Sequence, residues 1–204
     1  MMGAVLLFSC MDTIAKYLSR FYPVTGLLFA RYLAHLLVMI VWLAPHMKSG
    51  VLRAHFPVLQ IVRGVLLVSA TFCFFNALRH LPLAEASAIG FLHPLLLVAL
   101  SGPILKEKVR PARWIAVIAG FIGVLIIIRP GGGLLSPAAI WPMLNALFFS
   151  VYQIVTRMLS GKENSYTTLF YTALVGSAVS VFGILAPGGW ITPTPLHALM
   201  ILAM

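Results

Sequence analysis

The sequence predicts an all-α polytopic membrane protein, built as an inverted repeat of five-helix units whose second copy is truncated in this chain. Three observations lead to this fold class. Of the 204 residues, 61% are hydrophobic and 9% are charged, with a mean hydropathy of +1.04, whereas soluble domains hold roughly 25% charged residues. The hydrophobic residues form runs long enough to cross a bilayer as helices. Finally, residues in the first part of the chain recur 141 positions later.

The apolar runs predict seven membrane-spanning helices and the start of an eighth, since a span needs about 20 mainly apolar residues. The predicted spans are residues 5–18, 26–43, 59–78, 84–105, 114–128, 138–159 and 168–185, with an eighth from residue 196. A helix that ended inside the bilayer would leave its last carbonyl groups without hydrogen-bond donors. We therefore expect this sequence to be a piece of a ten-helix protein, or a chain whose homodimer supplies the missing helices.

The internal repeat is predicted from identities at a constant offset of 141 residues. The identical pairs include Leu6 and Leu147, Phe8 and Phe149, Ser9 and Ser150, Leu28 and Leu169, and Phe29 and Phe170. A unit of five helices returns the chain to the opposite side of the membrane, so the second copy is inverted. The predicted domains are a first repeat over residues 1–130, with about five helices, and a partial second repeat over residues 138–204, with about two and a half. Inverted repeats are typical of secondary transporters, whose sites lie near the midplane between the repeats.

Basic residues between the spans predict the orientation. Loops after even-numbered helices hold nine Lys and Arg residues, and those after odd-numbered helices hold four. The positive-inside rule then places the N-terminus in the cytoplasm. The net charge of +10 comes largely from these basic residues. We expect them to contact anionic lipid headgroups, and we predict no nucleic-acid partner. Cys10 and Cys73 lie in apolar runs without disulfide or metal-site spacing.

Residues 81–131 are predicted to form two spans joined by a basic hairpin. The first begins Leu-Pro-Leu-Ala-Glu-Ala, has small residues along its first half, and is predicted to kink at Pro94. The hairpin holds Lys106, Glu107, Lys108, Arg110 and Arg113, and the second span holds Trp114, two glycines that indicate close helix packing (Gly120 and Gly123), and a terminal Arg-Pro-Gly. This ordered set of positions resembles the EamA domain of the drug/metabolite transporter superfamily.

The resemblance implies a secondary transporter of the bacterial inner membrane. Such a protein would move a small organic metabolite by alternating access, coupled to protons or by exchange. The family includes carriers of amino acids, amphipathic compounds, riboflavin and S-adenosylmethionine. The sequence Phe-Ser-Cys-Met-Asp-Thr-Ile-Ala-Lys-Tyr at residues 8–17 is similar to the S-adenosylmethionine uptake branch, so an uptake carrier for that solute, or for riboflavin, is one alternative.

Nine residues are candidates for substrate binding, because polar groups inside a membrane are costly and often functional. They are Asp12, Lys16, Arg31, Asn76, Ser87, His93, Pro94, Tyr152 and Gln153. Asp12 and Lys16 share a helix face and could pair; alternatively Lys16 extends to the interface. The resemblance implies that Arg31 faces a central cavity, where it could bind a carboxylate or phosphate. His93 is interpreted either as a proton-coupling group or as a neutral histidine that hydrogen-bonds another helix.

Two further functions stay open, namely an intramembrane enzyme and a truncated protein that does not transport. An enzyme would need a reactive cluster, yet the chain has four acidic residues and no motif spacing of metal ligands or of a nucleophile with its base. We therefore predict no enzyme activity, no catalytic residues, no cofactor and no metal. The predicted partners are a small-molecule substrate and membrane lipid.

Overall fold

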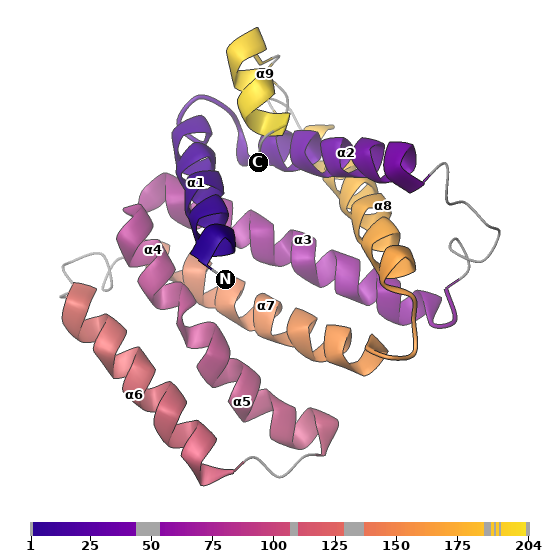
Figure 1. The fold of residues 1–204 in the computed structure, drawn as a ribbon. Helices are drawn as coiled ribbons and strands as arrows, with labels where there is room; N and C mark the ends of the chain where they lie inside the picture. The colour runs from indigo at the N-terminus through magenta and orange to yellow at the C-terminus, as the bar shows by residue number, and fades with distance from the viewer. Residues whose placement is uncertain are drawn as a thin grey trace. The chain divides into compact units, whose positions relative to one another are not determined.

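The computed structural model describes residues 2–43, 54–106, 110–128, 137–185, 189, 191 and 193–202, and its regular structure there is helical (Figure 1). The helices are α1 (Met2–Leu18), α2 (Val24–Leu43), α3 (Pro57–His80), α4 (Leu83–Gly90), α5 (Leu92–Leu105), α6 (Pro111–Ile128), a 3-10 turn (Pro137–Ala139), α7 (Ile140–Leu159), α8 (Ser165–Ile184) and α9 (Pro195–Leu202). Within the described residues, five helical segments, counting α4 and α5 as one, are long and apolar enough to cross a membrane. The prediction of an all-α polytopic membrane protein is confirmed. Glu107, Lys108 and the predicted Arg-Pro-Gly terminus of α6 lie outside the described residues.

Local sequence explains where several helices begin. Proline stands at the first position of α3, α6 and α9, where its missing N–H costs nothing and its fixed φ already fits a helix. The side chain of Asn164 caps α8, because its Oδ1 accepts the N–H of Tyr166 at 3.0 Å. The connections before α6 and α8 are short, covering residues 106–110 and 160–164, so these helices can reverse the direction of the chain.

Contacts divide the chain into two compact units. Unit 1 comprises residues 1–68 and 159–204, and unit 2 comprises residues 69–158, with α3 continuing through both. In unit 1, α2 packs along α8, and α9 packs on α1 and α2; in unit 2, α4, α5 and α6 pack on one another. Each unit holds helices from both predicted repeats. The repeat boundaries therefore stay a prediction.

The α2–α8 pair in unit 1 is antiparallel and tightly packed. Gly176 faces the ring of Tyr32 so closely that a Cβ would overlap it, and a Cβ on Gly183 would lie 3.0 Å from Thr25. The Ser177 hydroxyl donates to the Tyr32 carbonyl at 3.0 Å. Both ends of α8 follow those of α2 by 141 residues, the offset found in the sequence.

Connections in unit 1 meet in two sets. Glu163, after α7, accepts the N–H of Phe56, after α2, at 2.7 Å. Tyr22, after α1, has its hydroxyl 2.8 Å from Nδ1 of His197, in α9, and Thr25 donates to the carbonyl of Gly189, after α8, at 3.3 Å. Counted as predicted spans, α1, α2, α7 and α8 are the first, second, sixth and seventh. The connections after the second and sixth spans thus contact each other, and those after the first and seventh contact the first turns of α9 and α2, which agrees with successive membrane crossings.

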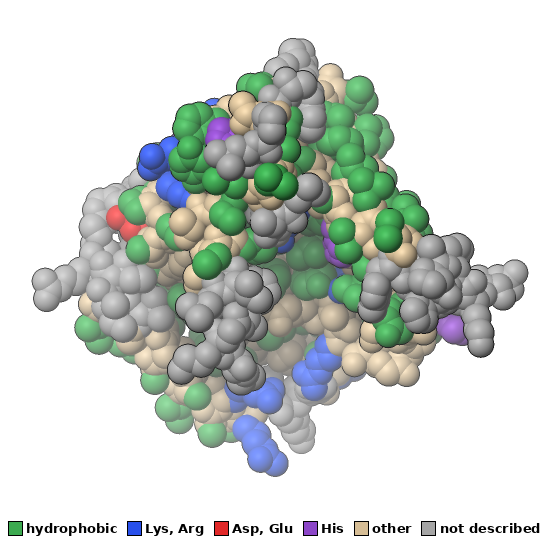
Figure 2. Space-filling view, turned by 45° about the horizontal axis from the view of Figure 1, so that its top comes forward, with side chains coloured by type: hydrophobic (Ala, Val, Ile, Leu, Met, Phe, Trp, Pro, Cys, Tyr) green, Lys and Arg blue, Asp and Glu red, His purple; other side chains and the backbone are tan. Residues whose placement is uncertain are grey.

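Much of the surface is apolar. Figure 2 shows hydrophobic side chains over much of the visible described surface, and on α6 a stripe of exposed isoleucines repeats at helical spacing: Ile115, Ile118, Ile122 and Ile126. Such a stripe suits contact with lipid chains. The predicted close packing at Gly120 and Gly123 is wrong, because a Cβ on either glycine would meet no described atom within 4 Å. These glycines lie on a helix whose described faces are largely open.

Candidate functional site

A break between α4 and α5 lies one turn before Pro94, in unit 2. Pro94 has no N–H to donate to the carbonyl of Gly90, four residues earlier, and its ring crowds that carbonyl. Phe91, which separates the two helices, follows Gly90 directly. The predicted kink is therefore confirmed, and it is centred one turn N-terminal to the proline.

His93 supplies the hydrogen bond that Pro94 removes. Its Nδ1 lies 2.9 Å from the Gly90 carbonyl oxygen. Because a carbonyl oxygen can only accept, Nδ1 carries the hydrogen, which leaves Nε2 of the neutral ring as an acceptor. The observed hydrogen bond lies within the same span and not, as one interpretation expected, to another helix. Pro94 leaves the Gly90 carbonyl without a backbone donor, and this carbonyl is the nearer acceptor for His93.

Helix α7 holds the break in place from the side. The fully buried Ser150 has its hydroxyl 2.9 Å from the His93 carbonyl and 2.6 Å from the Ala146 carbonyl, so one hydrogen serves two acceptors. The ring of Phe149 packs edge-on against His93 with centroids 5.4 Å apart, and Tyr152 stacks on Phe149 at 5.6 Å. One stretch of α7 therefore fixes both the backbone and the ring at the kink.

A cavity of about 450 Å³ opens beside this kink, between α5, α6 and α7. Its volume lies within the range of about 300–1,000 Å³ that is usual for small-molecule sites. Its wall on α5 runs from Pro94 to Leu105 and is mostly apolar. The polar lining comes from Ser101, from Gln153 of α7, and from two arginines.

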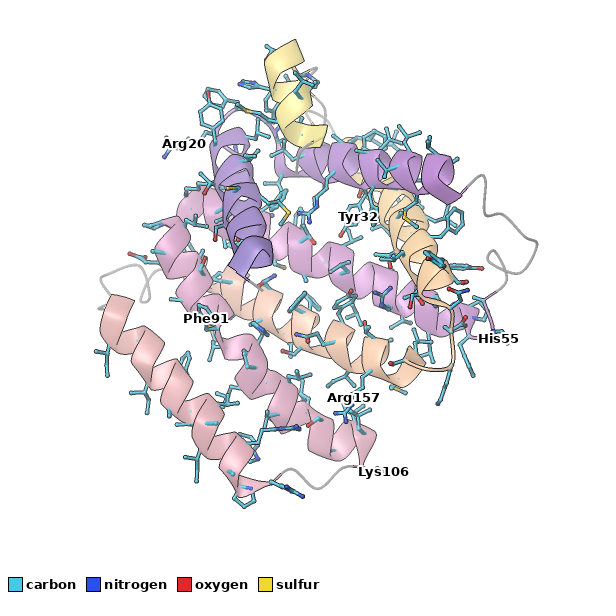
Figure 3. All side chains as sticks on the ribbon, viewed as in Figure 1. Arg20, Tyr32, His55, Phe91, Lys106 and Arg157 are labelled. Carbon is cyan, nitrogen blue, oxygen red and sulfur yellow. The ribbon has the colours of Figure 1, made fainter. Side chains whose placement is uncertain are left out.

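The two arginines, Arg113 and Arg157, lie where three helices end. Arg113 is in the first turn of α6, and Arg157 is in the last turn of α7. Both side chains are exposed. Figure 3 shows Arg157 near the end of α7 and Lys106 at the end of α5, and Leu105 lines the same cavity as Arg157. The cavity therefore has one cationic end and one end at the kink.

The structure brings some of the predicted site residues of unit 2 together. Pro94 and Gln153 line the cavity, and His93 and Tyr152 join the aromatic cluster at the kink (ring contacts through Phe149). Asn76 donates to the Phe72 carbonyl of its own helix at 2.8 Å, and Ser87 is half-buried on α4. Neither of these two is among the described lining residues.

The other predicted residues lie in unit 1. Asp12 on α1 interacts electrostatically with Arg31 on α2, and the Arg31 guanidinium lies 3.7 Å from the sulfur of Met11. Arg20 is one of the charges near Lys16. The pairing of Asp12 with Lys16 stays a prediction.

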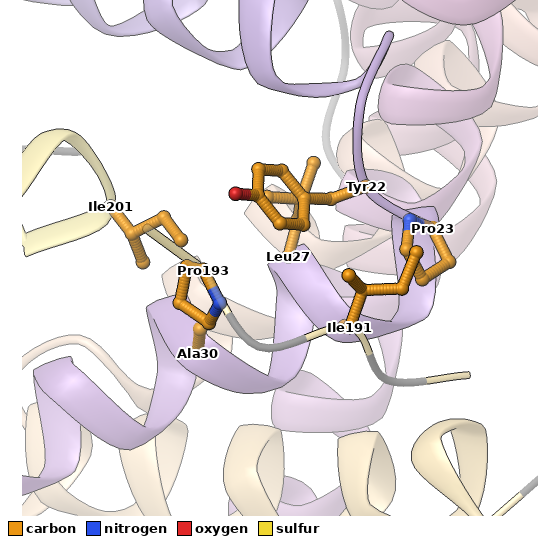
Figure 4. Close-up of a pocket in the computed structure, with 8 residues that line it drawn as sticks. Tyr22, Pro23, Leu27, Ala30, Ile191, Pro193 and Ile201 are labelled. Carbon is orange, nitrogen blue, oxygen red and sulfur yellow. The ribbon is translucent and has the colours of Figure 1, made fainter. Parts of the chain in front are cut away.

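A second pocket lies in unit 1, between α2 and the segment that leads into α9 (Figure 4). Tyr22, Leu27, Pro193 and Ile201 line it, and its volume is about 10 Å³, which is room for about one water. It is a packing defect too small for an organic solute. Among the described residues, no group of three His, Cys, Asp or Glu side chains could hold a metal.

Sequence reasoning missed Arg113, Arg157 and Ser150 as site residues. The two arginines were interpreted only as residues that set orientation. A weak signal was present, because Gln153 and Arg157 lie four residues apart and share a face of α7. Nothing in the sequence pairs Ser150 with a carbonyl on another helix.

Comparison with known proteins identifies the family. Residues 1–129 match the EamA-like transporter family. The chain belongs to this family. A solved crystal structure that is 22% identical has a TM-score of 0.70, covering 98% of this chain and 73% of that one, which shows the same fold.

Several relatives have named functions. The S-adenosylmethionine uptake transporter of Rickettsia bellii is 28% identical over 186 residues, which cover 91% of this chain and 63% of the relative. The riboflavin transporter of Rhizobium johnstonii is 29% identical over 70% of this chain and 47% of its own length. The pseudopaline exporter CntI of Pseudomonas aeruginosa is 26% identical over 85% of this chain and 61% of its own length. The chain thus spans less than two thirds of each of these three relatives.

Proposed function

We propose that this EamA-family protein is a secondary transporter that moves a small organic metabolite across the membrane by alternating access. One observation carries the proposal: a cavity of about 450 Å³ lies beside a proline-broken span in a member of a transporter family. Broken helices that line a cavity are a recurring feature of transporter sites. The apolar wall would hold the body of the solute, and Ser101 and Gln153 would orient it.

The break provides a hinge for the conformational step. The wall formed by α5 begins at the break, so a tilt of α5 relative to α4 changes the cavity directly. The hydrogen bond between the Gly90 carbonyl and the His93 ring would persist during a small tilt, because the two residues are only three positions apart, on either side of Phe91. A hinge between elements needs only a few residues whose backbone angles change.

The relatives suggest which solutes to test. S-adenosylmethionine is the first choice, because its uptake transporter from Rickettsia bellii aligns with 91% of this chain. Riboflavin is the second, from the relative in Rhizobium johnstonii. We place the protein as a carrier and not as an enzyme, so the solute would leave the protein chemically unchanged.

We also propose the bacterial inner membrane as its location, with the N-terminus in the cytoplasm. The excess of basic residues in loops after even-numbered spans supports this orientation. The contacts between Glu163 and Phe56 support the placement of two such loops on one side. Single-cysteine variants with Lys162→Cys or Arg20→Cys would test this orientation, by comparing how a thiol reagent labels each cysteine from the outside and from the inside of inside-out vesicles.

The decisive experiment is solute flux into proteoliposomes that contain the protein as its gene encodes it. Labelled S-adenosylmethionine, riboflavin and a set of amino acids would be tested with and without a pH gradient, against protein-free liposomes. Saturable counterflow of one solute is the expected result. Absence of flux for the whole panel would overturn the proposal, and recovery of a chemically altered solute by mass spectrometry would favour an enzyme instead.

A further inference from the structure

We infer that Arg113 and Arg157 bind an acidic group, a carboxylate or a phosphate, of an organic solute whose apolar part lies along α5. This inference rests on the proposed function and names its substrate class. The site is the cationic end of the α5–α6–α7 cavity.

Charge is the first argument. Among the described lining residues of the cavity, the charged side chains are Arg113 and Arg157, and they come from different helices. An anion at this end of the cavity would accept charge-assisted hydrogen bonds from guanidinium groups on two different helices.

The position of Arg113 strengthens this argument. Arg157 is in the last turn of α7, where the helix dipole favours a cation, but Arg113 is in the first turn of α6, where the dipole opposes one. The N-terminus of α6 therefore adds positive potential to that of the two guanidinium groups. A bound carboxylate or phosphate would offset all three.

Cavity shape indicates an organic solute with an acidic group and not a bare inorganic ion. Pro94 and Leu105 bound the α5 wall, and the eleven residue steps from one to the other extend roughly 16 Å along the helix. Gln153 lies one turn before Arg157 on α7, farther from the cationic end. A solute with an acidic group, an apolar body and a second hydrogen-bonding group would match this order.

The same arrangement disfavours an anionic lipid. A lipid headgroup could also meet the two arginines, but its acyl chains would then lie along the α5 wall against the Gln153 amide. An amide without a hydrogen-bond partner in such surroundings is costly. We therefore assign the site to a solute, and the test includes a lipid arm.

The test measures how fast phenylglyoxal modifies individual arginines, by peptide mass spectrometry, in the full protein in phosphatidylcholine nanodiscs. The probes are indole-3-acetate and its neutral amide, indole-3-acetamide. At ten times its dissociation constant, indole-3-acetate should slow modification of Arg113 and Arg157 about tenfold, because protection follows occupancy. The amide should not protect them. Arg110, which is exposed and is not among the described lining residues, provides the internal control.

Two variants and a change of lipid complete the test. Arg157→Gln should abolish the protection of Arg113, whereas Arg110→Gln should preserve it. Equal protection of Arg110, equal protection by the amide, or no protection by indole-3-acetate would each overturn the inference. Protection that appears only with phosphatidylglycerol would assign the site to lipid and overturn it too. Labelling needs no transport, so lost flux with intact protection would refute the proposed function alone.

Discussion

The α2–α8 pair of unit 1 and the α5–α6–α7 group of unit 2 show two ways in which apolar helices meet. In the first, Gly176 and Gly183 let the backbones approach, and large side chains such as Tyr32 fill the remaining space. In the second, arginines at the helix ends and a proline break leave a cavity of about 450 Å³. The α2, α7 and α8 helices and the combined α4–α5 segment are all long and apolar enough to cross a membrane.

The difference shows that glycine marks close packing only where a large partner faces it. Gly120 and Gly123 on α6 lie three residues apart, yet no described atom lies within 4 Å of a Cβ placed on either. Gly176 has no such partner glycine and is nevertheless the tightest contact. Inside a membrane, helix association depends on van der Waals fit, which the partner determines.

Gly176→Ala should be the most damaging of the substitutions considered. The new Cβ would overlap the buried ring of Tyr32, and overpacking of this kind typically costs about 1–3 kcal/mol. Unfolding by SDS titration in mixed micelles would measure the loss. Gly120→Ala is the matched control, since alanine favours a helix by about 1 kcal/mol over glycine where there is room. Equal stability of the two variants would remove the contrast between the regions.

The next largest effect concerns Arg157, at the cationic end of the cavity, and the KM for transported solutes. S-adenosylmethionine carries a carboxylate, and riboflavin carries no acidic group. If both are transported, Arg157→Gln should raise the KM for S-adenosylmethionine about tenfold or more, since a hydrogen bond to a charged group contributes about 1.5–3 kcal/mol. The KM for riboflavin should stay nearly constant in proteoliposome flux. A parallel rise for both solutes would mean that Arg157 acts on the fold and not on an acidic group.

The helices could be predicted because their signals are local. Apolar runs and flanking prolines or basic residues placed the predicted spans within a few residues of the observed helices, as for residues 26–43 against α2 and 138–159 against α7. The kink was also predictable, because Pro94 alone determines which carbonyl loses its donor. The constant offset between α2 and α8 agrees with the repeat identities read from the sequence.

The cavity could not be predicted because its residues come from three helices. Arg113 and Arg157 are 44 positions apart, and only tertiary packing reveals that they line one cavity. His93 is among the predicted site residues, but its hydrogen-bond partner could not be predicted, because the Gly90 carbonyl becomes a free acceptor only once the proline is placed in a helix. Asn76 shows the opposite case, where an amide that could have reached a cavity bonds its own helix.

His93→Phe should destabilise the break by about 1 kcal/mol, because the Gly90 carbonyl would lose its donor inside a span. His93→Asn should retain most of the stability, since an amide in this chain already reaches a backbone carbonyl one turn earlier, at Asn76. SDS titration of both variants would separate the two effects. If they were equally unstable, ring packing against Phe149 and not the hydrogen bond would be the main contribution of His93.

Ser150→Ala should have the smallest effect on stability, about 0.6 kcal/mol, the average for a hydrogen bond between membrane helices. Its hydroxyl shares one hydrogen between the carbonyls of His93 and Ala146, so each bond is weaker than a full one.

A local measurement at the break is therefore more sensitive to Ser150→Ala than global unfolding. Amide hydrogen exchange over residues 87–97 should become faster, because the α4–α5 break opens more often once α7 no longer holds it. Thr156→Val is the control, since the Thr156 hydroxyl donates to the Tyr152 carbonyl of its own helix. Unchanged exchange in Ser150→Ala would show that the aromatic contacts alone hold the break.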